Sequence, residues 1–453
     1  MDTRKERRRR PNTVEWGKNL LIVLLVFSAV YLAGRSGMVH ELSGGTPSGW
    51  MGSLISFFRS RGEAVPVEAP GDGRPAMAAQ AVRIAICNGE ERFAVQYDTA
   101  QTDRLFDAVG GLLGEGLASA KSPEQVDEAV WRRALQTPGV YFDFLGQIPL
   151  DALYAWLGEG ASNPNLSGTA RRVLLARDST DAVVLYYSNE ETGLYYACGT
   201  AVIYSGHMEE MLAGYGGNGA FFAFEYGAEQ SYAELDPYVL IFSAPPTPGA
   251  YRISNPLAGV AGAQLEALQN ALSFRPQSSS AVYPVQGGIT VREGRETLTI
   301  ASDGTVTYHA PEQDASRYMV AEDGQSATDA QVIEAARELA AAAGSWAGSA
   351  RLYLTELEYG EDGTQTVRFG YSLEGAMVRL SGDLPAAEFT VRGGQITDYT
   401  IRFRTYEATG ETTLVLREQL AAAALSALDR EGRELILCYE EIGDLAQAGW
   451  VAQ

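Results

Sequence analysis

The sequence predicts an α+β protein: a single N-terminal transmembrane helix, then a multi-domain ectodomain of antiparallel sheets with helices packed on one face. Three observations support this prediction. A cationic cluster precedes an uninterrupted apolar run within the first 36 residues. Short alternating patterns typical of strands recur from residue 82 onward, and two-residue turns that contain glycine join several of them: Asn88-Gly89, Asp303-Gly304 and Gly393-Gly394. Helical patterns with one apolar face separate the groups of strands, as in α+β domains.

The N-terminal segment predicts both location and orientation. Residues 1–18 form a basic stub with seven Lys/Arg and three Asp/Glu, a net charge of +4. Residues 19–35 form the transmembrane anchor, with Trp16 at the membrane interface and the Lys18 side chain extending to it. Cationic residues stay on the cytoplasmic side. We therefore expect a single-pass protein of the cell membrane, with its N-terminus in the cytoplasm and its ectodomain extracellular.

A cleaved signal peptide is the alternative interpretation of this segment. The charge-free stretch 19–34 is shorter than the ~20 residues that a spanning helix usually needs. Counting from Val14 restores a sufficient length, and the exit from Tyr31 to Ser36 offers no clean small-x-small cleavage site. These observations favour an uncleaved anchor.

The charge of the remaining chain limits its partners. The chain carries −22 overall, so the residues after the stub carry −26. A strongly acidic surface argues against nucleic acid and anionic lipid as partners. The alternative is that the negative charge only keeps the domain soluble. The three cysteines, Cys87, Cys198 and Cys438, are far apart and match no metal or redox spacing. We expect no disulfide framework, no metal and no cofactor.

Residues 36–79 predict a flexible tether, because Gly, Ser and Pro recur there. Within it, the apolar stretch 50–58 fits three locations: the outer membrane surface, a partner, or the core of the chain itself. Residues 80–250 predict an N-terminal α+β unit. Its expected strands are 82–86, 92–97, 140–144, 172–176, 183–187, 194–197, 201–204 and 238–243, with helices over 105–117, 123–135 and 150–157.

Two further units follow. The middle segment, 251–326, predicts a helix over 263–272 and strands at 289–292, 297–301 and 305–309. The C-terminal unit, 327–453, predicts a helix that Thr328 caps, four alternating strands, a second helix over 413–428 and a last strand. The second helix should bury its apolar face, made of Leu416, Leu420, Ala423, Ala424 and Ala427. The strands are expected at 352–359, 367–374, 388–392, 395–404 and 434–439.

A search for catalytic groups yields no candidate. The three histidines, His40, His207 and His309, have no motif around them. The glycine-rich stretch 214–219 lacks the order of a phosphate loop and a nearby lysine, so we expect a flexible surface loop. Tyr and Phe are dense between residues 186 and 251. Strand cores explain most of these rings, and part of the region is a candidate for protein contact.

The C-terminal motifs resemble a known family. The stretch 367–378 (VRFGYSLEGAMV) followed by 387–399 (AEFTVRGGQITDY) is similar to the C-terminal strand–turn–strand unit of the YycH/YycI regulatory proteins of low-GC Gram-positive bacteria. The start of the anchor, 16–25 (WGKNLLIVLL), is similar to the anchor of that family. The resemblance covers the anchor, the order of the domains and about 130 C-terminal residues, and it is weak in residues 80–250.

This resemblance implies a non-enzymatic regulator. In that family two single-pass accessory proteins restrain an essential cell-wall sensor kinase, so the implied partners are a sensor histidine kinase and a sister accessory protein; a dimer is also possible. Association of membrane helices depends on small residues, and the anchor offers Ser28, Ala29, Ala33 and Gly34. The alternatives are an extracytoplasmic cell-wall hydrolase and a ligand-sensing protein. Both would need a pocket of convergent polar groups.

Overall fold

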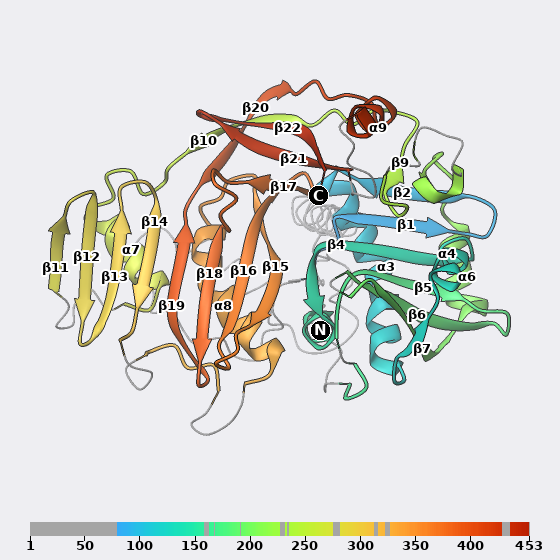
Figure 1. The fold of residues 1–453 in the computed structure, drawn as a ribbon, viewed down its shortest axis with the longest axis horizontal. Coiled ribbons are helices and arrows are strands. Elements are labelled where there is room, and N and C mark those ends of the chain that lie inside the picture. The colour runs from blue at the N-terminus through green and yellow to red at the C-terminus, as the bar shows by residue number, and fades with distance from the viewer. Residues whose placement is uncertain are drawn as a thin grey trace, which may run out of the picture. The chain divides into compact units, whose positions relative to one another are not determined.

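A computed structural model describes residues 79–157, 163–166, 168–190, 192–226, 232, 235–274, 281–311, 316–321, 327–427 and 435–452. These residues form a seven-stranded sheet, a thirteen-stranded sheet and a small two-stranded sheet (Figure 1). The α+β class and the antiparallel character of the sheets are confirmed. Among the named strand pairs, β17 (Ala376–Arg379) and β21 (Leu435–Ile442) alone run parallel.

The seven-stranded sheet contains the N-terminal strands in the order β2-β1-β4-β5-β6-β7-β3. The hairpin expected around Asn88-Gly89 is confirmed, but its loop has four residues, 88–91, instead of two, because Cys87 pairs with Arg92. Gly89 lies in this loop at φ +101°, a conformation that glycine adopts without strain. The strands are β1 (Arg83–Cys87), β2 (Arg92–Gln96), β3 (Glu124–Val126), β4 (Gly139–Pro149), β5 (Thr169–Arg177), β6 (Ala182–Asn189) and β7 (Leu194–Ile203).

Helices cover both faces of this sheet. The helix α3 (Thr99–Ser119) packs on the face that contains Ile84, and the helix α5 (Leu150–Leu157) lies beside it. The helix α4 (Glu128–Ala134) packs through Trp131 on the face that contains Ala85. Successive strand residues point to opposite faces, so the expectation of helices on one face is wrong here.

Three predicted elements of this unit differ in the structure. The helix expected over 123–135 begins at Glu128, because Glu124–Val126 pair with β7 as an edge strand. The two strands expected at 194–197 and 201–204 are one strand, β7, because its pairing with β6 continues through Gly199. The strand expected at 238–243 is reduced to β9 (Leu240–Ile241), which pairs with β8 (Phe221–Phe222). Each difference depends on a partner distant in sequence.

The thirteen-stranded sheet joins the middle and C-terminal segments. Its order is β11-β12-β13-β14-β19-β18-β16-β17-β21-β22-β10-β20, with β15 paired to β16 (Figure 1). Strands from 251–326 therefore pair directly with strands from 327–453. The remaining strands are β10 (Gly249–Ser254), β11 (Ala281–Val285), β12 (Gly288–Glu293), β13 (Glu296–Ala301), β14 (Thr305–His309), β15 (Arg351–Tyr359), β16 (Gln365–Leu373), β18 (Ala387–Arg392), β19 (Gln395–Arg402), β20 (Thr405–Thr412) and β22 (Leu445–Ala452).

Local signals in this part are well predicted. The helix α8 (Asp329–Gly344) begins at a capping box formed by Thr328 and Gln331. The Gly393-Gly394 turn joins β18 and β19 with φ of +55° and +76°. The other helices are α7 (Ala263–Ala271) and α9 (Glu418–Ala427), and α9 is shorter than expected.

One hydrophobic core extends through both large sheets. It includes Leu113 of α3, Leu153 of α5 and Val332 of α8, together with inward-facing residues of the two sheets. The helices α5 and α8 pack against each other, and so do α7 and α8. The two sheets thus share one continuous apolar layer.

Candidate functional site

The predicted anchor residues lie outside the described residues. This applies to Trp16, Lys18, Ser28, Ala29, Ala33 and Gly34, and also to His40. Within the part of the chain that the structure describes, no helix is long and apolar enough to cross a membrane.

The other titratable candidates are not brought together. His207 lies in the helical turn Tyr204–Met208, and His309 ends β14, where its ring contacts the exposed carboxylate of Asp398. Cys198 is buried, and burial raises the pKa of its thiol to about 11. Across the described ranges, no cluster of His, Cys, Asp or Glu has an arrangement that would hold a metal ion.

The glycine-rich stretch 214–219 covers a sheet edge. The Asn218 side chain accepts a hydrogen bond from the Ala94 N–H and donates one to the Ala94 carbonyl, at 3.1 and 2.7 Å. The Gly217 N–H donates to the Glu91 carboxylate at 2.7 Å. This stretch therefore lies on the surface, as expected, and hydrogen bonds connect it to β2 and to Glu91.

The dense aromatic region is mainly a core. Rings from β6, β7 and the 221–242 segment pack with Trp131 of α4 in edge-to-face and tilted pairs. Of the described rings in this region, Tyr226 is among the large side chains that stay exposed, at 45%. Packing in the cores thus accounts for most of these rings. Tyr186, Tyr195, Phe222, Phe224, Tyr238 and Phe242 belong to the cluster around Trp131, and the other clusters include Tyr187, Tyr196, Tyr204, Tyr215, Phe221, Tyr232 and Tyr251.

The two large sheets meet where β4 contacts β15. Gly146 lies at an irregularity of β4, between Asp143 and Ile148, and faces the bulge of β15 between Leu354 and Glu356. A Cβ atom at Gly146 would lie 1.9 Å from the Leu354 carbonyl oxygen. The backbones therefore approach closer than any side chain would permit.

The first described residues of the chain lie at this junction. Ala79 and Ala81 are buried, and the Val82 N–H donates to the Asp143 carbonyl oxygen at 2.8 Å. Val82 also lies near the turn at Gly375, between β16 and β17, where an added Cβ atom would be 3.4 Å from the Val82 carbonyl oxygen. The segment 79–82, which we call the entry segment, thus contacts both large sheets.

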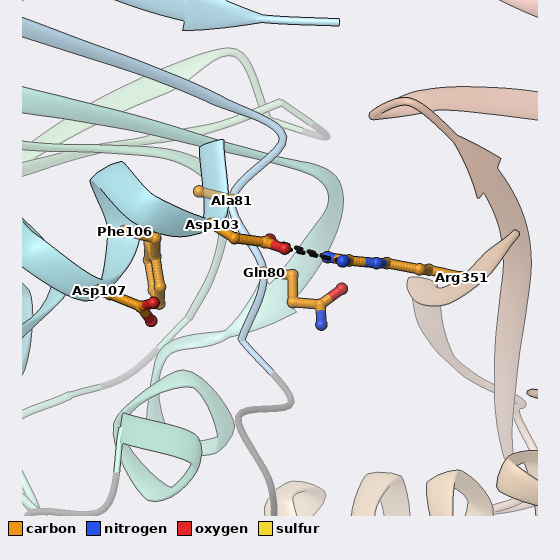
Figure 2. Close-up of a pocket in the computed structure, with 6 residues that line it drawn as sticks. All are labelled: Gln80, Ala81, Asp103, Phe106, Asp107 and Arg351. Atoms are coloured by element: carbon orange, nitrogen blue, oxygen red, sulfur yellow. Dashed lines mark hydrogen bonds and ion pairs between the residues drawn. The ribbon is translucent and has the colours of Figure 1, made fainter. Parts of the chain in front are cut away.

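A small polar pocket lies beside the entry segment (Figure 2). Its volume is about 190 Å³, and Gln80, Ala81, Asp103, Phe106, Asp107 and Arg351 line it. The Arg351 guanidinium donates to both Asp103 carboxylate oxygens, at 2.8 and 2.7 Å. This bidentate pair bridges α3 and β15. The volume is below the roughly 300–1,000 Å³ of typical small-molecule sites.

A buried ionic row lies next to the same segment. Asp143, fully buried, receives hydrogen bonds from Arg83 at 3.2 Å and from Arg171 at 3.0 Å. Arg172, on the adjacent strand, contacts Asp236 at 3.3 Å. Buried charges need such partners. The row connects β1, β4 and β5 with the segment before β9. No local sequence pattern predicts it.

The helix α9 differs most from its prediction. Its buried residues are Ala421, Ala422 and Glu418, whereas Leu416 and Leu420, expected in the core, are 52% and 58% exposed. Ala423 and Ala424 are exposed as well. The predicted apolar face therefore points outward, because the alanines of the opposite face pack against Leu435 and the 223–241 segment.

Comparison with known proteins identifies one solved structure with a similar fold. No family model matches the chain, and no curated protein matches its sequence. Among solved structures, the crystal structure of YycH from Bacillus subtilis is similar, with a TM-score of 0.50 and 13% sequence identity. The similarity covers 83% of this chain and 94% of that chain. It therefore reaches beyond the C-terminal motifs into residues 80–250, and the fold of the chain is YycH-like.

Proposed function

We propose that this chain is a non-enzymatic, membrane-anchored extracytoplasmic regulator of a sensor histidine kinase. The observation that carries the proposal is the YycH-like fold, which covers 94% of the YycH chain. The basic stub followed by an apolar run supports an anchor with the ectodomain outside the cell. The C-terminal motifs support the same family, in which the accessory proteins act on a kinase.

The proposed regulation acts through lateral contacts. In the anchor, Ser28, Ala29, Ala33 and Gly34 permit close approach of a partner helix. The ectodomain supplies a second contact. Two linked contacts raise the effective concentration of each other, so each one can be weak.

The entry segment provides a route between these two contacts. It leads from the tether into the junction, where Val82 is hydrogen-bonded to β4 and Gln80 lines the pocket beside Arg351. A displacement of the tether therefore acts first on the contact between the two sheets.

Exchange of anchor residues tests the proposal. Ala29→Leu with Ala33→Leu enlarges the small positions, and Val23→Leu with Val30→Leu enlarges a different side of a helical anchor as the matched control. We expect crosslinking in cells to recover a histidine kinase or a sister accessory protein with the wild type and the control, and less with the alanine variant. If all three chains are exported in equal amounts, a lower crosslinking yield does not come from a lower amount of protein at the membrane. If no chain captures either protein, the proposal is wrong.

A further inference from the structure

The strand β4 leaves its sheet where it meets the other large sheet. Its pairing with β5 stops at Asp143 and resumes at Ile148, so residues 144–147, which we call the β4 bulge, lie opposite a single residue of β5. The bulge meets β15, because the Gly146 backbone lies against the Leu354 carbonyl group. A change in the shape of the bulge therefore changes the contact between the two sheets.

The β4 bulge is a strained part of the backbone. Leu145 has φ +70°, in the left-handed region, where the Cβ atom of a leucine lies too close to the backbone carbonyl group. The side-chain oxygen of Gln147 is also buried, without a hydrogen-bond partner among the described residues. Both features cost free energy, and they persist only where the surrounding structure fixes them. The bulge should therefore relax when its surroundings give way.

Asp143 holds the bulge in this conformation. Its carboxylate is fully buried and accepts a hydrogen bond from the Leu145 N–H at 2.9 Å. The same carboxylate accepts hydrogen bonds from Arg83 of β1 and Arg171 of β5, at 3.2 and 3.0 Å. A buried carboxylate between two guanidinium groups has little freedom to move. The strained leucine is thus anchored to the strands on both sides of β4.

The entry segment is attached to the same aspartate. The Val82 N–H donates to the Asp143 carbonyl oxygen at 2.8 Å, and the next residue is Arg83, whose guanidinium holds the Asp143 carboxylate. Asp143 therefore binds the entry segment through its carbonyl group and the β4 bulge through its carboxylate. A displacement of Val82 that moves Asp143 also weakens the hydrogen bond that holds Leu145.

We propose that the β4 bulge is a strained joint that couples the entry segment to the contact between the two sheets. When the entry segment is displaced, Asp143 shifts, the Leu145 N–H loses its acceptor, and the release of strain moves the bulge away from β15. By linkage, loss of the contact at Gly146 loosens the entry segment by the same factor. The role of this joint in signalling rests on the proposed function, whereas the coupling itself does not.

Hydrogen exchange of the detergent-solubilised full chain, resolved by residue, tests the joint at the Val82 N–H. Leu145→Gly and Leu145→Ala both remove the leucine side chain, but only glycine adopts φ +70° without strain. We expect the Val82 N–H to exchange roughly fivefold more slowly in Leu145→Gly than in Leu145→Ala, because the relief of strain exceeds the extra freedom of glycine in the open state. Equal rates, or a faster rate in Leu145→Gly, would overturn the proposal.

Asp383 provides the matched control. It has φ +54° in the exposed loop after β17, so the same pair of substitutions relieves strain outside the joint. Asp383→Gly and Asp383→Ala should give the same exchange rate at the Val82 N–H. A difference as large as that between the two Leu145 variants would mean that strain elsewhere in the chain has the same effect, and the joint would then be refuted.

A second pair of variants tests the contact between the sheets. A Cβ atom at Gly146 would clash with the Leu354 carbonyl oxygen, and one at Gly139, at the other end of β4, with the Leu175 carbonyl oxygen. Both substitutions strain β4, but only Gly146→Ala pushes the bulge away from β15. We expect the Val82 N–H to exchange about tenfold faster in Gly146→Ala than in Gly139→Ala. Exchange that is no faster there contradicts the coupling. Because no kinase takes part in these measurements, a failure of the joint is distinguishable from a failure of the proposed function.

Discussion

The contact between the two sheets at Gly146 makes a sharp prediction about stability. In Gly146→Ala, the new methyl group would lie 1.9 Å from the Leu354 carbonyl oxygen and 3.0 Å from the Thr355 Cα atom. A carbon atom approaches a carbonyl oxygen to about 3.3 Å. Strands β4 and β15 must therefore separate by more than ~1 Å. Both are held by hydrogen bonds within their own sheets, so the separation strains the core between them.

The expected cost is at the upper end of the range for overpacking. That range is about 1–3 kcal/mol, and the clash here involves backbone that cannot rotate away. We expect a loss of about 3 kcal/mol in the free energy of unfolding. With a urea m-value of about 3 kcal/mol/M, the unfolding midpoint falls by about 1 M.

Gly111→Ala is the matched control, with the opposite sign. Gly111 is exposed in the middle of α3, and a Cβ atom there would meet nothing within 4 Å. Alanine in a helix should raise the stability by about 0.5–1 kcal/mol. Urea unfolding followed by tryptophan fluorescence measures both variants, since Trp131 and Trp156 are buried. A Gly146→Ala chain that unfolds at or above the wild-type midpoint refutes the reasoning.

Three further predictions concern electrostatics and topology. Burial raises the pKa of the Glu418 carboxyl group. Its contribution to the free energy of unfolding is therefore greatest below its ordinary pKa of 4.5 and is lost as the pH rises through its pKa in the folded state. Glu418→Gln should stabilise the chain at pH 7 and flatten the dependence of the free energy of unfolding on pH, and an unchanged pH dependence would contradict this. The side chains of the Asp103–Arg351 pair are about 40% exposed, so Asp103→Ala should lower the free energy of unfolding in urea by at most about 1 kcal/mol. The double variant Asp103→Arg with Arg351→Asp should be more stable than either single variant. If the losses of the two single variants simply add in the double variant, the two side chains do not interact directly. A reporter active in the cytoplasm alone should be silent when fused after Gln453, and activity there would reverse the predicted orientation.

The sequence by itself determined the elements whose causes are local. The cap at Thr328 and the turn at Gly393-Gly394 appear as predicted, and the hairpin around Asn88-Gly89 forms with a longer loop. Each is specified by residues within a few positions of one another, through a hydrogen bond or a positive φ. Together with the alternating strand patterns, they were sufficient to predict the α+β class.

Tertiary structure decided what depends on distant partners. Glu124–Val126 form a strand because β7 offers a free edge, although their own sequence favours a helix. Asp143 is buried because three arginines surround it. The candidate site could not be predicted from the sequence either, because some 270 residues of sequence separate the entry segment from Arg351.

The helix α9 shows the reason most clearly. Its leucines outweigh its alanines in hydrophobicity, so periodicity alone assigns Leu416 and Leu420 to the core. The close approach of α9 to Leu435 and the 223–241 segment admits small side chains, and the alanines are buried instead. Sequence patterns specify which residues are apolar. The surface against which a helix packs decides which of its faces is covered.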